Sequence, residues 1–459
     1  MAAEKYTIVA LELATTSIRA IAGQRMPDGT MQVVAFAEEN ASNCIRKGII
    51  DNIDKTTQAI SRVLGQLSLQ LGQTISRVYV GLNGQSLHSV QNRIQRSFSE
   101  RKQITNALID ELMDTNRGVV YTDSQILEVI PQEYKAGNRS EIDIVGIQVE
   151  QMEANFLNII ARNSLSENIE KCVNGAGFEV AELLITPLAM GDTILGAAEK
   201  RSGCAIADIG ADTTTVGFYT KNILRKLVVI PLGGNNVTMD IAKCLKTEIE
   251  EAEMLKLKYG RAWAENQDTA CNNIITYSHE REISESGLID IIEARYEEIL
   301  YNIWAQIEDD NEKLTSGIVF TGGAAQIRHL TDAFSYITKC GKQTRVVKGL
   351  PSDISTAGGV FVPDNGRLNS ILALLLHGDQ NCIVHITAPI TPAVEEVPSG
   401  EDCPTADQAS NSNSMDGGNS SSEGAAQAQT VETPKKKRSI WELFTRALTD
   451  DDEEETTIS

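Results

Sequence analysis

The sequence predicts an α/β protein built from two similar halves, on three observations. Strand-like apolar runs alternate with helical runs up to about residue 385, as in proteins whose strands are joined by crossover helices. A strand–turn–strand segment with small and hydroxyl residues in its turn occurs twice, about 195 residues apart. The chain has 459 residues, which is too long for one ordinary core and suits two or more domains.

Composition excludes several classes of protein. The net charge of −22 argues against general nucleic-acid binding, which needs Lys and Arg to neutralise phosphates. The eight cysteines are scattered without a C-x-x-C pair, so we expect reduced thiols and neither a zinc site nor a disulfide framework. No signal peptide is visible, and apolar runs such as residues 371–376 are far too short to span a bilayer. We therefore expect an intracellular protein that could touch a membrane only from the side.

The expected elements follow in chain order. Strands are predicted at residues 6–13, 31–37, 77–81, 204–209, 215–219 and 317–321, and helices at 54–71, 236–245 and 288–307. The last core helix could be residues 350–360 or 367–378, and the apolar run favours the second. From about residue 387 the chain becomes rich in Ser, Gly, Pro and Asn, which predicts a disordered linker.

The two repeated turns have the chemistry of phosphate sites. Each follows an apolar strand that carries a carboxylate near its end, Glu12 in the first and Asp208 in the second. Small residues let the backbone approach phosphates, turn N–H groups and Thr hydroxyls can bond their oxygens, and the carboxylates can hold Mg²⁺ through water. The expected contacts are Ala14, Thr15, Thr16, Asp208, Gly210, Thr213 and Thr214, with Glu12 and Asp208 as metal ligands.

Three further segments suit a nucleotide. A Gly pair precedes the predicted helix 236–245, where free N–H groups would attract an anion. An Ala-Glu-x-x-Lys run places two opposite charges on one helix face, and a buried strand ends in a Gly-Gly turn that could lie against adenine. The expected contacts are Gly233, Gly234, Asn235, Glu253, Lys256, Gly322, Gly323 and Ala324.

In this order, the five segments resemble the ATPase core shared by actin, sugar kinases and heat-shock chaperones. The stretches 233–242 and 252–260 are most similar to the FtsA family of bacterial cell-division proteins, and Pro131-Gln132-Glu133-Tyr134 matches the signature of that family's inserted subdomain 1C. Thr186-Pro187-Leu188-Ala189 resembles its connecting helix. The resemblance covers about residues 5–380 and implies a bacterial source of Bacteroidetes type.

The resemblance implies an actin-like (ribonuclease H-like) fold of two domains and four subdomains that binds ATP and Mg²⁺. It assigns residues 1–84 and 163–195 to subdomain 1A, 85–162 to 1C, 196–235 and 305–385 to 2A, and 236–304 to 2B. It further implies self-polymerisation, binding of the tubulin-like FtsZ polymer through 236–304, recruitment of later division proteins, and a peripheral position on the cytoplasmic side of the inner membrane at the division site.

The chain departs from the family pattern at several site positions. Glu12 replaces an Asp, Ala14 replaces a Gly, Ala211-Asp212 replaces a Gly pair, and Thr186 replaces a Glu of the connecting segment. Asp212 adds a carboxylate where triphosphate charge is expected, which would repel unless a metal intervenes. No catalytic residue is assigned, because phosphoryl transfer needs a positioned water and no convincing general base is apparent. We expect a slow ATPase at most.

The C-terminal segment predicts a membrane-targeting helix over 435–449, after the linker 386–434 and before an acidic tail, 450–459. A block of four cations precedes a Ser N-cap, and the apolar residues that follow occupy an arc of roughly 160° at 100° per residue. Such a helix suits the interface of an anionic membrane. Its expected contacts are Lys435, Lys436, Lys437, Arg438, Ile440, Trp441, Leu443, Phe444, Ala447 and Leu448.

Other interpretations remain open at this stage. The terminal helix could dock on a partner protein or fold back on the core, and its basic block is similar to a nuclear import signal. The whole chain could be a kinase or phosphatase of the same superfamily, or a pilus-assembly scaffold of the same fold. A chaperone is disfavoured, because 388–434 is too poor in apolar residues to form a substrate-binding domain.

Overall fold

A computed structural model describes residues 6–41, 44–137, 139–142, 144–263, 273–277, 281–349, 351–363 and 365–384. These residues belong to one compact unit, Met1–Ala388. The predicted linker, membrane helix and acidic tail lie outside the described residues.

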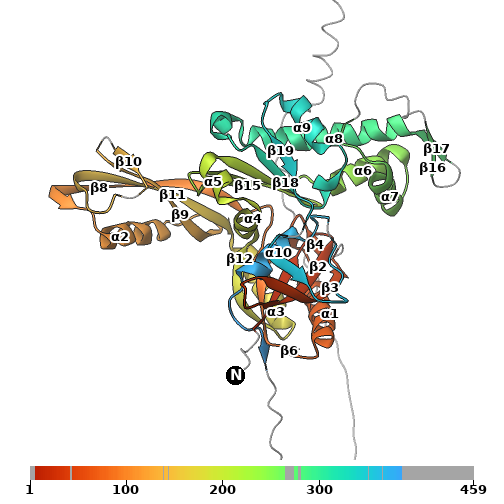
Figure 1. The fold of residues 1–459 in the computed structure, drawn as a ribbon, viewed down its shortest axis with the longest axis horizontal. Helices are drawn as coiled ribbons and strands as arrows, with labels where there is room; N and C mark the ends of the chain where they lie inside the picture. Colours follow the sequence, from red (N-terminus) through yellow and green to blue (C-terminus); the bar gives the residue numbers. More distant parts are fainter. Residues whose placement is uncertain are drawn as a thin grey trace, which may run out of the picture. The chain divides into compact units, whose positions relative to one another are not determined.

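The first half is built on a six-stranded sheet (Figure 1). Its strand order is β12 (Glu179–Ile185), β7 (Arg77–Leu82), β1 (Thr7–Leu13), β2 (Ser17–Arg25), β3 (Met31–Asn40) and β20 (Ile354–Thr356). Helices α1 (Ile53–Leu71) and α3 (Asn163–Gly175) pack together against it, and α4 (Thr186–Ile194) packs with α10 (Asn369–His377). Short pairs are β4 (Ile45–Arg46) with β5 (Ile49–Ile50), and β6 (Thr74–Ile75) with β21 (Ile383–Val384).

Local sequence signals explain the ends of α1. The Asn52 side chain accepts a hydrogen bond from the Lys55 N–H at the N-terminus, and Gly72 ends the helix with φ of 64°. A side chain would strain a left-handed residue at this point, so glycine is the favoured stop. The apolar stripe between these caps, which includes Ile60 and Leu64, is fully buried. The predicted helix at 54–71 is therefore confirmed.

The C-terminal part of the described chain returns to the first half. Strand β20 pairs in parallel with β3, and α10 packs against β1, β2 and β7. The assignment of the whole range 305–385 to subdomain 2A is therefore wrong for residues from β20 onward. The reason is hydrophobic: the apolar residues of α10, such as Leu372 and Leu374, are completely buried in the core of the first half. The choice of this helix over residues 350–360 is confirmed.

The second half contributes five strands to a nine-stranded sheet: β15 (Ile223–Ile230), β14 (Thr214–Thr220), β13 (Cys204–Ile209), β18 (Ile318–Thr321) and β19 (Thr344–Val346). Its helices are α5 (Ala197–Ser202), α6 (Gly234–Leu245), α7 (Ile249–Tyr259), α8 (Glu285–Ala305) and α9 (Leu330–Thr338). A small hairpin pairs β16 (Ile274–Tyr277) with β17 (Arg281–Ser284). This half has its own hydrophobic core, in which Phe320 and Phe334 make an edge contact.

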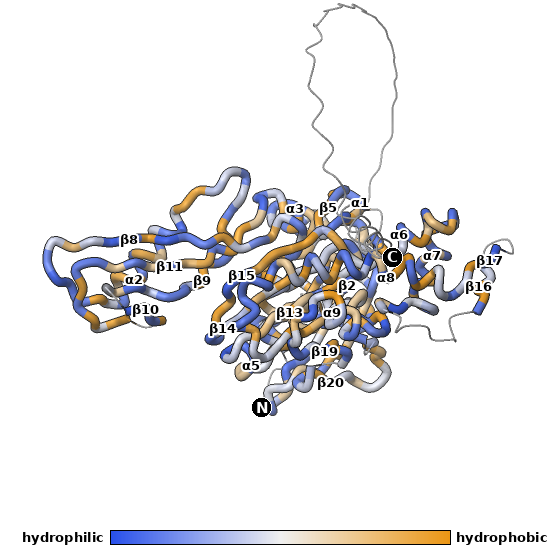
Figure 2. The backbone as a smooth tube through the Cα atoms, turned by 90° about the horizontal axis from the view of Figure 1, so that it is seen from above, coloured by the Kyte–Doolittle hydropathy of each residue, from blue (hydrophilic) through white to orange (hydrophobic). Residues whose placement is uncertain are grey.

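An inserted domain contributes the other four strands, β10 (Arg139–Glu141), β9 (Ser124–Ala136), β11 (Gln148–Arg162) and β8 (His88–Gln103), with helix α2 (Asn106–Arg117). It has a third core, which contains an edge contact between Tyr134 and Phe156. Figure 2 shows that β8 is largely hydrophilic, whereas the strands around β13 and β14 carry long apolar stretches. The insertion follows β7 and precedes α3, so both of its covalent connections run to the first half.

Candidate nucleotide-binding site

The two predicted phosphate turns have the same geometry. In the first, the Ala14 N–H donates to the Ser17 carbonyl at 3.0 Å, and in the second, the Gly210 N–H donates to the Thr213 carbonyl at 2.9 Å. Each turn joins two antiparallel strands, β1 to β2 and β13 to β14. The N–H groups between these anchors, including those of Thr15 and Thr16, donate to no described residue. They are therefore free to bind anionic oxygens.

Helix α6 begins directly on the second turn. The Gly234 N–H donates to the Gly210 carbonyl at 3.0 Å, and the Asn235 N–H donates to the Ala211 carbonyl at 2.7 Å. The Gly233 N–H is taken by the Asn236 side chain. The expectation of free N–H groups at this helix N-terminus is therefore wrong, because the turn itself satisfies them.

The two glycines of this loop instead allow its backbone to pack closely against neighbouring residues. A Cβ on Gly233 would lie 2.5 Å from the Ala211 carbonyl oxygen, and a Cβ on Gly234 would lie 3.0 Å from the Ala324 Cβ. The loop thus touches both the second turn and the predicted adenosine turn. The loop therefore brings together three segments that were each expected to contact the nucleotide: the second phosphate turn, the start of α6 and the adenosine turn.

The charged pair of α7 also reaches this point. Lys256 bonds Glu253 at 2.7 Å, the Thr238 hydroxyl at 2.8 Å and the Gly234 carbonyl at 3.1 Å. The Lys256 side chain is only 11% exposed, so it is not an ordinary surface cation. Glu253 keeps a 38% exposed side chain beside it. This arrangement holds the first turn of α6 in place and leaves a carboxylate that can accept hydroxyl groups.

The predicted adenosine turn packs on the second phosphate strand. Gly322 has φ of 95°, and a Cβ there would lie 2.4 Å from an Asp208 carboxylate oxygen and 2.5 Å from the Ile209 carbonyl oxygen. Only glycine fits both the backbone conformation and the space. Gly323 and Ala324 continue the turn, and the Ala324 carbonyl accepts from the Tyr296 hydroxyl at 2.7 Å.

Asp212 ties the two halves together. One carboxylate oxygen accepts from the Asn235 side chain at 2.7 Å, and the other accepts from the Lys47 N–H of the first half at 3.1 Å. The next residue, Gly48, donates to the Thr15 hydroxyl in the first turn at 3.3 Å. Asp212 therefore has a structural role in joining the two halves, and its charge still lies beside the expected phosphates.

A cavity of about 340 Å³ opens beside this bridge. It is lined by Arg46, Lys47, Ile49, Asp51, Gln85 and Asp212. None of the expected nucleotide contacts lines it, and only Asp212 belongs to one of the two turns, so the cavity lies beside the expected site.

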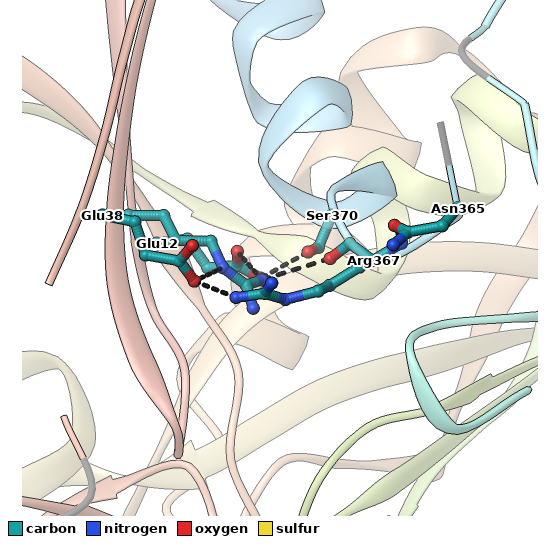
Figure 3. A network of polar contacts seen from close by, with 6 residues as sticks. Glu12, Glu38, Asn365, Arg367 and Ser370 are labelled. Carbon is teal, nitrogen blue, oxygen red and sulfur yellow. Dashed lines mark hydrogen bonds and ion pairs between the residues drawn. The ribbon is translucent and has the colours of Figure 1, made fainter. Parts of the chain in front are cut away.

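Glu12 belongs to an ion-pair network (Figure 3). One of its oxygens accepts from Arg19 at 3.0 Å, and the other accepts from the Ser370 hydroxyl. Arg19 is 5% exposed and also bonds Glu38, which pairs with Arg367 as well. Both Glu12 oxygens accept hydrogen bonds in this structure, which weakens the case for Glu12 as a metal ligand.

Asp208 fits a metal site better than Glu12 does. Its carboxylate lies against Gly322 and accepts no hydrogen bond from a described residue. Burial raises the pKa of Asp208 to about 7, and the negative charge of Glu12 adds to this rise. A nearby divalent cation would favour the ionised form and would neutralise phosphate charge.

A small void lies beside the connecting helix, and one carboxylate lines it among the described residues. This void of about 10 Å³, room for about one water, is lined by Pro187, Met190, Ile206, Asp208, Thr215 and Gly217. Asp208 is its only titratable lining residue. Thr186 begins α4 as predicted and is buried. Among the described residues, no group of three or more His, Cys, Asp or Glu could hold a metal ion by itself.

Sequence reasoning missed Arg19, Glu38, Ser370 and Lys47. Arg19 could have been found, because a hairpin of β1 and β2 places it directly opposite Glu12, and the next pairing places it opposite Glu38. No local signal pointed to Ser370, which is far away in the chain. The predicted membrane contacts, Lys435–Leu448, lie outside the described residues. No described helix has the length and apolarity needed to cross a bilayer.

Comparison with known proteins decides the family. A family profile described as "Cell division protein FtsA" matches residues 205–359, and one described as "SHS2 domain inserted in FTSA" matches residues 84–160. The cell division protein FtsA of Escherichia coli is 30% identical over 343 residues, which cover 72% of this chain and 81% of that protein. The chain belongs to the FtsA family. The FtsA of Porphyromonas gingivalis is 29% identical over 407 residues, which cover 86% of this chain and 83% of that protein.

A solved structure supports the fold. The "PilM-PilN type IV pilus biogenesis complex" matches with a TM-score of 0.57 and 16% identity, covering 80% of this chain and 97% of that one. At this identity the likeness concerns the fold alone. Membership of the FtsA family makes this chain an actin-like cell-division protein, and the ATPase fold of the family implies nucleotide binding.

Proposed function

We propose that this chain binds ATP with Mg²⁺ between its two halves and that ATP favours its polymerisation. The observation that carries this proposal is the pair of matching turns whose N–H groups are free. The second turn touches the Gly233-Gly234 loop and, through Asp208, Gly322. Asp208 would hold the metal, with water and phosphate oxygens as further ligands. Glu12 is left out of this role because Arg19 and Ser370 occupy it.

Equilibrium binding of labelled ATP tests this directly. We expect binding in the presence of Mg²⁺ and at least tenfold weaker binding when the metal is chelated, because the metal neutralises part of the triphosphate charge. Asp208→Asn should show the weaker affinity even with Mg²⁺ present. A chain that binds no ATP with Mg²⁺ present would contradict the proposal.

We further propose that the chain tethers the FtsZ polymer to the cytoplasmic face of the inner membrane and recruits later division proteins. Membership of the FtsA family supports this role, and the segment 435–449 would supply membrane contact. One short helix binds reversibly, so a polymer of the chain would gain strength from many such contacts.

The FtsZ-binding surface is expected within residues 236–304. Helix α7 exposes two apolar side chains one turn apart, Met254 at 63% and Leu257 at 74%. Two exposed apolar side chains one turn apart form a small patch that a protein partner can cover. We therefore place the contact on this face of α7.

Replacing Leu257 with aspartate should weaken co-sedimentation with FtsZ polymer about tenfold, because the anchor is lost and a charge is introduced. The fold should be unaffected, since the side chain is mostly exposed. Leu69→Asp is the matched control: Leu69 is 85% exposed on α1, in the first half, and its replacement should leave FtsZ binding unchanged. Equal FtsZ binding by both variants would exclude this face.

A further inference from the structure

The Pro131-Gln132-Glu133-Tyr134 motif lies where the insertion meets the second half. Tyr134 points into the insertion's own core, but the two residues before it reach strand β15. The Gln132 side chain donates to the Leu224 carbonyl at 3.0 Å and accepts from Arg225 at 3.0 Å, and Glu133 accepts from Arg225 at 2.8 Å. The motif is thus a set of contacts across a domain junction.

Buried apolar residues on both sides of this junction, among them Leu157 of β11 and Leu227 of β15, belong to one hydrophobic cluster, but the backbone pairing across it is short. Strand β8 pairs with β15 at a single position, His88 with Val228, and the Leu227 N–H donates to the Ser89 hydroxyl at 2.8 Å. By contrast, β14 pairs with β15 along its whole length. The nine-stranded sheet therefore has a seam between β8 and β15, where backbone pairing is limited to one position and side chains make the other contacts.

The central cation of the seam is incompletely satisfied. The Arg225 side chain is 14% exposed, and only its Nη1 atom has acceptors, while buried Nε and Nη2 donate to no described group. Burial by itself would raise the pKa of Glu133, but the hydrogen bond and charge of Arg225, and Lys221 at 3.6 Å, lower it below its ordinary value. A buried guanidinium with unused donors costs free energy, and this cost offsets part of what the contacts across the seam contribute.

The seam bridges the two halves of the protein. The insertion is covalently joined to the first half at both ends, and Gln132 and Glu133 attach it to the second half. Strand β15 then runs directly into the Gly233-Gly234 loop, and the Thr214 hydroxyl after the second phosphate turn bonds the Leu232 carbonyl at 2.8 Å. A change in the distance between the halves would therefore act on the seam and on the strand that leads to the phosphate turn.

We propose that Gln132, Glu133 and Arg225 form a clamp that positions the two halves around the nucleotide, so that closing the clamp and binding ATP favour each other. This rests on the proposed ATP binding. Because coupling is reciprocal, ATP must tighten the clamp by the same factor by which the clamp raises ATP affinity. If the clamp only stabilised the fold, breaking it would lower the free energy of unfolding and leave the affinity for ATP unchanged.

The test uses the full chain and measures ATP affinity with Mg²⁺ together with hydrogen exchange of β9 and β15. Glu133→Gln keeps the side-chain shape and removes the charge, and we expect about fivefold to tenfold weaker ATP binding, within the usual range of coupling. ATP should slow exchange in β9 of the natural chain and do so much less in the variant. The exchanged pair Glu133→Arg with Arg225→Glu should regain at least part of the affinity.

Glu150→Gln is the matched control. Glu150 pairs with Arg101 at 3.1 Å within the insertion and is remote from the seam, so its loss should leave ATP affinity unchanged. If the natural chain binds ATP and Glu133→Gln binds it equally well, the coupling is overturned and the proposed function stands. If the natural chain binds no ATP, both are overturned. If Glu133→Gln does not fold, the exchanged pair decides, and its failure to show ATP-dependent protection of β9 overturns the clamp.

Discussion

Replacing Gly322 with alanine is expected to weaken ATP binding more than tenfold and to lower the free energy of unfolding by about 1–3 kcal/mol. The new Cβ would meet the Asp208 carboxylate at 2.4 Å and the Ile209 carbonyl at 2.5 Å, and φ of 95° is unfavourable for alanine. Relief requires β13 and β18 to move apart, which would displace both the carboxylate and the adenosine turn. Denaturant titration and equilibrium ATP binding measure the two effects.

Gly358→Ala provides the control for this substitution. No heavy atom lies within 4 Å of a Cβ built on Gly358, so the change should leave both quantities within about 0.5 kcal/mol of their original values. If Gly322→Ala binds ATP as tightly as the natural chain does, the turn from Gly322 to Ala324 does not contact the nucleotide.

Ending the chain at Pro434 should remove at least nine-tenths of its recruitment to anionic liposomes. Lys435–Arg438 contribute roughly 1 kcal/mol each near such a surface, and the apolar face of 440–448 adds burial in the lipid interface. Co-sedimentation of FtsZ with the liposomes should fall in parallel, because the bridge between polymer and membrane is lost. ATP binding should be unchanged, since every expected nucleotide contact lies before residue 385.

A second truncation isolates the cations from the acidic end. Removing residues 450–459 deletes six consecutive carboxylates, which anionic lipid repels, and should keep or strengthen liposome binding. Raising the salt concentration should weaken liposome binding by the full chain and by the chain that lacks residues 450–459, because both retain the basic block. Equal recruitment of the chain ending at Pro434 and of the full chain would contradict the tether.

The sequence by itself determined the fold class and the positions of the two repeated turns. Strand, turn and helix signals are local: the apolar run before Ala14, the Asn52 and Gly72 caps of α1, and the Gly pair before α6 act over a few residues. Their order along the chain was enough for the resemblance to the FtsA family. Those expectations were confirmed because neighbouring residues decide them.

Tertiary structure alone decided what the site's polar groups do. Ser370 bonds Glu12 across 358 residues of sequence, Asp212 bonds Lys47 across 165, and Gln132 bonds Leu224 across 92. Long-range packing also places α10 against the first sheet. It provides carbonyl acceptors for the N–H groups at the start of α6. The sequence identifies a residue as Asp or Glu but does not tell whether its carboxylate is free, paired or buried. Its available charge is set by the neighbours that folding brings to it, so Glu12 and Asp208 came to differ in what they can bind.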